Sequence, residues 1–162
     1  MAQKNEEILF EAQGLLQKQT FGVLSSHSTR LSGYPHTSVL PYIVDSHGCI
    51  LILISRLALH TRNIKKNHKV SLFVMPGAEG DVQNSPRLSI SCDASELALQ
   101  QVDRVAEAYY ARFPHSFGYH EQLDFEFYEL HIQEVGFVAG FGGVKYFDAR
   151  QWLQYFQTNG AN

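Results

Sequence analysis

The chain has 162 residues, of which 44% are hydrophobic and 18% are charged, and this composition is typical of a single globular domain. The formal net charge is -3 and the lysines and arginines are scattered, so the sequence shows no basic face of the kind that nucleic-acid binding requires. The histidines form neither an HExxH motif nor another paired metal-ligand spacing, so we expect no metal site.

Other sequence features bear on the cellular compartment. Cys49 and Cys92 form no CxxC motif, and we expect both to be small buried residues in a reducing compartment. The N-terminal segment is acidic and amphipathic without a cleavage site, and no later segment reaches the length of a transmembrane helix. The sequence therefore predicts a cytoplasmic protein without a membrane partner.

The first half of the chain predicts one helix followed by strands. Apolar residues at helical spacing, from Ile8 to Leu16, predict an amphipathic helix within residues 1–18. A strand begins at Phe21, and a serine-rich turn over 25–33 follows it. The remaining expected elements of this half are a strand over 36–45, a tight turn over 45–48 and a strand over 49–54. Strands joined in this way form an antiparallel meander.

The second half predicts further strands and two more helices. Pro114 ends a helix over 101–113, and Asp148 is expected to cap a C-terminal helix or tail over 148–162. The strands expected in this half span 70–75, 87–94, 125–138 and 144–147, and residues 76–86 are expected to form an exposed loop.

These elements together predict the fold class. Six or seven short strands without regular βα alternation favour a mainly β protein with α, namely an antiparallel closed or nearly closed barrel with flanking helices. A doubly wound parallel sheet is disfavoured, since no GxGxxG follows the first strand. No repeat or linker divides the chain, so residues 1–162 are expected to form one domain, with the barrel over 20–147.

The strand–helix junction over residues 51–67 concentrates polar donors. An apolar run over 51–54 predicts a buried strand, and a helix-like segment follows it. The donors are Ser55, Arg56, His60, Thr61, Arg62, Asn63, Lys65 and Lys66. Hydroxyl, amide and cationic groups beside a helix N-terminus suit a phosphate. Ser, Thr and Asn are also common helix caps, and Arg and Lys are common on solvated helix faces, so a purely structural role stays open.

The order of several segments resembles a known superfamily. The segments are SGYPHTSVLPYIVDSHG, LISRLALHTRNIKKNHKVSL, PRLSI, ARFP, LDFEFYELHI and VAGFGGVKYF. From about residue 20 to residue 147 they are similar to the FMN-binding split barrels of the pyridoxamine 5'-phosphate oxidase superfamily. The branch that they resemble most includes haem-utilisation proteins of the HugZ type. The resemblance implies a homodimer of six- to seven-stranded antiparallel split barrels, with an FMN pocket at each subunit boundary.

The resemblance also implies which residues bind the flavin. Those placed near the phosphate are Ser55, Arg56, His60, Thr61 and Arg62, with Asn63 supporting the turn. Those placed near the ring are Ser38, Val39 and Arg87, and those that reach the cofactor from the partner subunit are Gly142, Lys145 and Tyr146. His60 falls where the oxidase branch often has a lysine, so a positive charge at this position depends on pH.

The haem-utilisation branch implies a different ligand. In that branch haem lies at the dimer interface, ligated by a histidine of a C-terminal extension and assisted by an acidic residue that Asp124 matches. The tail after Phe147 contains no histidine, so an internal histidine would have to take that place. Asp124 is also explained, slightly better, as a cap or as a strand-edge charge that discourages edge pairing.

The sequence thus predicts an FMN-binding oxidoreductase-like protein of unknown substrate. The flavin would exchange two electrons with a nicotinamide cofactor or another small-molecule substrate. No Ser/His/Asp or Cys/His set indicates a nucleophile, so the catalytic residues stay unassigned. The alternative is a haem-binding, haem oxygenase-like protein, and a third possibility is a cofactor-free binding module on the same barrel.

Overall fold

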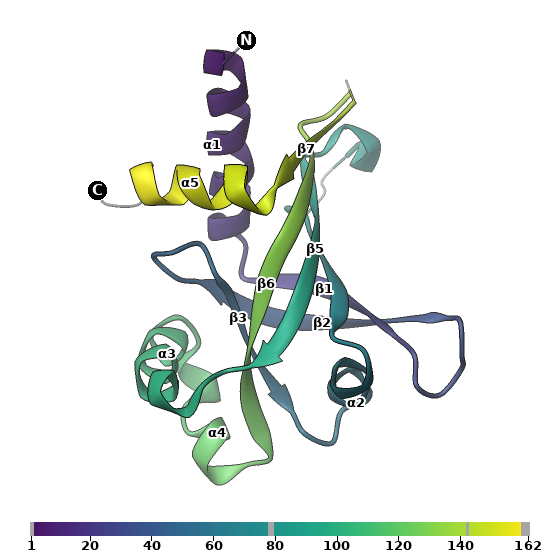
Figure 1. The fold of residues 1–162 in the computed structure, drawn as a ribbon, viewed down its shortest axis with the longest axis vertical. Coiled ribbons are helices and arrows are strands. Elements are labelled where there is room, and N and C mark those ends of the chain that lie inside the picture. Colours follow the sequence, from purple (N-terminus) through teal and green to yellow (C-terminus); the bar gives the residue numbers. More distant parts are fainter. Residues whose placement is uncertain (1, 78–79, 142, 160–162) are drawn as a thin grey trace.

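Seven strands form one antiparallel sheet that closes into a barrel (Figure 1). The computed structural model describes residues 2–77, 80–141 and 143–159. The strands in these ranges are β1 (Phe21–His27), β2 (Pro35–Val44), β3 (Ile50–Ser55), β4 (Lys69–Val74), β5 (Arg87–Glu96), β6 (Phe125–Val138) and β7 (Val144–Asp148). Their order is β3-β2-β1-β4-β5-β6-β7, and an additional pairing of β3 with β6 closes a six-stranded ring that leaves β7 outside. The predicted barrel is confirmed.

Helices flank both ends of this barrel. The α-helices in the described ranges are α1 (Ala2–Lys18), α2 (Leu59–Lys66), α3 (Leu99–Arg112), α4 (Tyr119–Gln122) and α5 (Ala149–Asn159). Two single-turn 3₁₀ helices are η1 (Val82–Asn84) and η2 (Pro114–Ser116). Figure 1 shows α1 and α5 together at the end where β7 leaves the ring, and α3 and α4 at the opposite end.

Strand β3 is buried on both faces, which explains the unbroken apolar run in its sequence. On one face Ile50 and Ile52 belong to the large cluster that fills the barrel and continues to α1 and α5. On the other face Leu51 and Leu53 belong to a second cluster, which includes Tyr109 of α3. Because β3 pairs with both β2 and β6, it has no free edge, and its end at Ser55 is held firmly.

The C-terminal helix α5 is fixed to the barrel by a capping box. The Gln151 backbone N–H donates to the Asp148 carboxylate at 2.8 Å, and the Asp148 N–H donates to the Gln151 side-chain oxygen at 3.0 Å. The predicted cap at Asp148 is therefore confirmed. Trp152 of the same helix is fully buried, and its carbonyl accepts a hydrogen bond from the Gln13 side chain of α1 at 3.1 Å.

Two local predictions differ from the structure. Ser25 and Ser26 belong to β1 rather than to a turn, because β1 pairs with β2 as far as His27 and the buried Ser26 side chain donates to the His36 carbonyl. Cys49 lies just before β3 rather than inside a strand. Both cysteines are free thiols, and burial is the main cause that raises the pKa of each to about 12. In the described part of the chain, no helix is long and apolar enough to cross a membrane.

Candidate functional site

The strand–helix junction is the segment in which β3 ends and α2 begins. The Arg56 backbone N–H donates to the Asp124 carbonyl at 2.7 Å, so the turn after β3 is tied to the residue that precedes β6. The Ser55 hydroxyl accepts from the Leu57 N–H at 3.2 Å and thus completes a local turn. The N-cap of α2 is Ala58, which offers no side-chain cap.

Two of the residues expected near a phosphate are occupied inside the protein. Thr61 and Asn63 are both 0% exposed. The Thr61 hydroxyl donates to the Ser55 carbonyl at 2.6 Å. The Asn63 side-chain carbonyl accepts from the Thr29 N–H and the Thr29 hydroxyl, each at 2.8 Å, and its amide nitrogen donates to the Ser26 hydroxyl at 3.0 Å. Their polar groups thus fasten α2 to β1 and β3.

His60 forms a short hydrogen-bonded chain with β2. Its Nδ1 lies 3.1 Å from the Ser38 hydroxyl, which in turn lies 3.3 Å from Nε2 of His36. Burial lowers the pKa of His60 below its ordinary value, and the neighbouring His36 lowers it further. His60 is therefore neutral at pH 7. Its Nε2 is buried and has no hydrogen-bond partner among the described residues.

The cations of the junction are largely paired with one carboxylate. Arg56 Nε lies 2.6 Å from one oxygen of Glu126, and Lys65 Nζ lies 3.3 Å from the other oxygen. The Glu126 side chain is only 11% exposed. Arg62 is exposed and makes no ion pair with any residue in the described ranges. The junction thus presents one unpaired cation from its predicted phosphate-binding group.

A groove crosses the outer face of the barrel, away from the junction. Its floor contains Ser25, Ser71 and Ser91, which lie next to one another on β1, β4 and β5 in the sheet register. The main hollow has a volume of about 480 Å³, and the residues that line it include His27, Gly33, Lys69 and Gln133. A second hollow of about 170 Å³ adjoins it at Ser91 and is lined partly by Phe73 and Tyr146.

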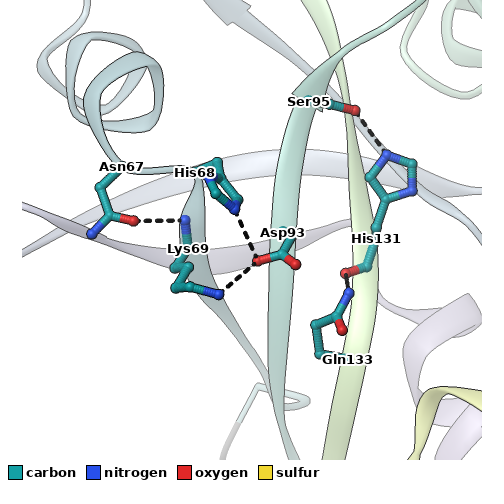
Figure 2. Close-up of polar contacts among 7 residues, drawn as sticks. All are labelled: Asn67, His68, Lys69, Asp93, Ser95, His131 and Gln133. Atoms are coloured by element: carbon teal, nitrogen blue, oxygen red, sulfur yellow. Dashed lines mark hydrogen bonds and ion pairs between the residues drawn. The ribbon is translucent and has the colours of Figure 1, made fainter.

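Charges gather at one side of the main hollow. Figure 2 shows the side chains of His68 and Lys69 reaching the Asp93 carboxylate of β5 from the same side. The Asp93 carboxylate lies 3.5 Å from Lys69 Nζ and 3.6 Å from His68 Nε2. Beside them the Ser95 hydroxyl lies 2.8 Å from Nε2 of His131 (Figure 2). His27 has no such partner among the described residues, so its imidazole is free to meet a ligand in the hollow.

The remaining predicted residues are spread over the molecule. Val39 is 69% exposed on the outer face of β2, whereas Ser38 points the opposite way, toward His60. Arg87 lines the second hollow, and its guanidinium donates to the carbonyls of Gln83 and Ser85. Lys145 is exposed on the face of β7 opposite to Tyr146. Within one subunit the structure therefore brings Ser38 into contact with His60 but gives Val39, Arg87 and Lys145 no contact with the predicted phosphate residues.

Two predictions concern residues outside this arrangement. Asp124 is exposed, and its backbone carbonyl holds the Arg56 N–H rather than facing the groove. Gly142 lies outside the described residues. The sequence interpretation missed His27 and the serine row, because small polar residues on separate strands become neighbours only once the strand register is known. Period-two alternation in the strands was the one signal that pointed to them.

The ring of six strands, the strand outside it and the flanking helices define a split β-barrel protein. Residues 4–154 match the model of the family described as CREG, beta-barrel, and the chain belongs to this family. The resemblance to the pyridoxamine 5'-phosphate oxidase-like split barrels and their haem-utilisation branch is confirmed.

Three relatives illustrate the likeness. The chain is 28% identical over 130 residues to a chloroplastic heme oxygenase named HOZ from Arabidopsis thaliana, covering 80% of this chain and 40% of that protein. It is 30% identical over 119 residues to heme oxygenase HutZ from Vibrio cholerae, covering 68% of this chain and 65% of HutZ. A solved heme binding protein from Mycobacterium smegmatis superimposes with a TM-score of 0.81 at 22% identity, covering 91% of this chain and 60% of that protein. The chain thus spans less than two thirds of each relative's length.

Proposed function

We propose that this chain is a haem-binding protein of the haem-utilisation type and that its haem site is the groove on the outer face. The names of the two curated relatives, both heme oxygenases, support haem as the ligand. The main structural support is the contrast between two places. The junction expected to hold a phosphate has most of its donors occupied, whereas the groove offers an open hollow with an unpaired histidine.

The residues of the groove fit a haem in size and chemistry. Its main hollow of about 480 Å³ falls within the range of about 300–1,000 Å³ that small-molecule and cofactor sites occupy. His27 supplies an imidazole, the usual protein ligand of haem iron. The aromatic rings of Phe73 and Tyr146 provide apolar surface in the adjoining hollow, and Lys69, which also pairs with Asp93 at 3.5 Å, lines the main hollow. The haem, when bound, would supply the redox chemistry of its iron.

Each part of the chain has a defined role in this proposal. His27 holds the ligand from the end of β1, and the serine row allows a flat ring to approach the sheet closely. The Tyr146 ring lies over Gly136, where an added Cβ would come within 3.1 Å of it, and this ring forms part of the wall of the second hollow.

We also propose that the groove is completed by a second copy of the chain, as the resemblance implies. Large apolar side chains are exposed on β2, on β7 and in the segment before β7, and a second barrel would cover them. These side chains include Val39, Phe141 and Tyr146. A homodimer would also shield a bound ring from water.

The second candidate is the flavin oxidoreductase that acts on a nicotinamide cofactor or another small molecule. Its specific support is Arg62, an exposed cation close to the start of α2, together with the shared split-barrel fold. This candidate requires the phosphate of FMN to displace contacts already made at the junction. It is therefore less well supported than haem binding. The cytoplasmic location stays a prediction from the sequence.

Spectroscopic titration tests the proposal. We expect hemin added to the purified protein to give a saturable Soret shift, and we expect the variant His27→Ala to weaken the binding and change the band. His47→Ala is the matched control, because His47 is an exposed histidine in the turn before β3. A protein that takes up FMN but shows no saturable hemin spectrum would reverse the order of the two candidates. If His27→Ala leaves the hemin spectrum unchanged, haem remains the proposed ligand of the chain, but His27 is ruled out as the residue that binds its iron.

A further inference from the structure

We infer that Glu126 determines which ligands the strand–helix junction accepts: its carboxylate holds Arg56 and Lys65 as a bound phosphate would, and it thereby excludes ligands that anchor through a phosphate. This inference does not depend on haem binding, since it concerns a different part of the barrel. It assigns to one residue of β6 the role of a specificity determinant.

The position of Glu126 makes this possible. Glu126 pairs with Ile54 in the sheet register and lies two residues before Tyr128, which is buried in the barrel core. Its side chain therefore points inward at the end of the barrel that α2 covers. The side chain is 11% exposed, whereas those of Arg56 and Lys65 are 53% and 51% exposed. The half-exposed side chains of Arg56 and Lys65 thus both contact the largely buried carboxylate of Glu126.

The contacts of Glu126 resemble those expected of a phosphate oxygen pair. Arg56 precedes α2 and Lys65 lies in its last turn, so the two cations come from opposite ends of the predicted phosphate-binding segment. One carboxylate oxygen lies 2.6 Å from Arg56 Nε and the other lies 3.3 Å from Lys65 Nζ. A contact of 2.6 Å is in the range of strong charge-assisted hydrogen bonds. Both cations are therefore already paired with one carboxylate inside the protein.

An incoming phosphate would have to break these pairs. Doing so would leave the Glu126 carboxylate with little solvent and no cation, and an uncompensated buried charge is strongly destabilising. Among the other donors, Thr61 and Asn63 are bonded internally and His60 is neutral at pH 7. The cations of the junction without an ion pair among the described residues are Arg62 and Lys66, which are both exposed. Only a ligand without a phosphate anchor avoids this cost.

Replacing Glu126 by glutamine tests the inference. Glutamine keeps the shape and the hydrogen-bonding capacity of the side chain but removes its charge, so Arg56 and Lys65 become free to hold a phosphate. We expect Glu126→Gln to bind FMN at least about tenfold more tightly than the unmodified protein, the effect of about one charge-assisted hydrogen bond. Riboflavin has the same ring without the phosphate, and its affinity should not change. Inorganic phosphate should compete with FMN for the same cations and so reduce the gain in FMN affinity. Fluorescence titration of the flavins measures all three.

The controls separate the proposed role from a general loss of negative charge. Glu107→Gln removes the same charge from the exposed face of α3 and should leave FMN affinity unchanged. An FMN affinity in Glu126→Gln equal to that of the unmodified protein would overturn the inference, as would an equal gain for riboflavin.

A second variant covers the case in which Glu126→Gln fails to fold. Arg56→Gln is made as a single substitution with Glu126 in place. If Glu126 already holds Arg56, this variant should bind inorganic phosphate and FMN with affinities within about twofold of those of the unmodified protein. A loss of binding beyond tenfold in this variant would show that Arg56 serves the phosphate and would contradict the inference. Hemin titration of the same samples reports separately on the haem proposal.

Discussion

Asn63 and Thr29 are joined by two hydrogen bonds, both to the side-chain carbonyl of Asn63, from the backbone N–H and the hydroxyl of Thr29. The two residues are 34 positions apart, and the contact fastens the loop after β1 to α2. We expect Asn63→Ala to lower the free energy of unfolding by about 2–4 kcal/mol, because it removes three hydrogen bonds of a fully buried side chain, including the buried one to the Ser26 hydroxyl. Urea denaturation measures this loss.

Asn67→Ala is the control for that prediction. Asn67 lies at the C-terminal end of α2, and its side-chain oxygen accepts one hydrogen bond from the Lys69 N–H at 3.1 Å in an exposed setting. We expect its replacement to cost less than about 1 kcal/mol. If the two variants were equally stable, the structural role given to Asn63 would be wrong.

The neutral state of His60 makes stability depend on pH. Burial and His36 lower the pKa of His60 in the folded protein, whereas the unfolded chain has an ordinary pKa of about 6.5. As the pH falls below about 6.5, the unfolded state binds a proton that the folded state does not bind, so the free energy of unfolding decreases. The loss is complete only below the folded pKa.

Substitution isolates this contribution from that of the other histidines. We expect His60→Asn, which keeps a polar group near the Ser38 hydroxyl, to lose less stability than the unmodified protein when the pH is lowered from about 7.5 to 5.5. His47→Asn, in an exposed turn, should leave the pH dependence as it is. Parallel pH profiles for the His60 variant and the unmodified protein would refute the assignment. Chemical denaturation at each pH supplies the data.

Two substitutions at Trp152 should separate the effect of lost side-chain volume on stability from the effect of an unpaired hydrogen-bond donor. The chain has a single tryptophan, and its indole N–H is buried without a hydrogen-bond partner among the described residues. We expect Trp152→Ala to cost about 3–5 kcal/mol of stability through the cavity that it leaves under α5. Trp152→Phe fills most of that volume and removes the unpaired N–H, so it should cost much less. Far-UV circular dichroism in urea provides the comparison, and equal losses would contradict it.

The homodimer proposal predicts a mass of twice 18.3 kDa by light scattering at micromolar concentration. Val39 lies on the outer face of β2 and is 69% exposed in the single chain. Val39→Lys would place a charge in the proposed interface and should shift the mass toward that of a monomer. Leu99→Lys is the matched control, since Leu99 is 83% exposed on α3 and should leave the mass unchanged. A monomeric mass for the unmodified protein would end the proposal.

The fold followed from the sequence because local patterns and turn residues agreed with one another. Strand β6 has the predicted bounds, Phe125–Val138, and the cap at Asp148 has the predicted role. The site was harder to predict. The donors near Ser55 match a phosphate motif, but sequence spacing does not reveal that Glu126, 61 residues after Lys65, forms ion pairs with two of them. Long-range ion pairs and strand register are properties of the closed barrel, and no local pattern encodes them.

The pairing of β3 with β6 has a consequence for biosynthesis. The ring closes only when residues 125–130 have left the ribosome, because this part of β6 supplies the partners for Ile50 to Ser55. Until then the nascent polypeptide carries a long apolar strand with one side unprotected, a template on which other chains aggregate. We therefore expect truncated chains that stop before residue 125 to be captured by chaperones or degraded. In the full-length chain, the late pairing of β6 with β3 covers the exposed strand edge.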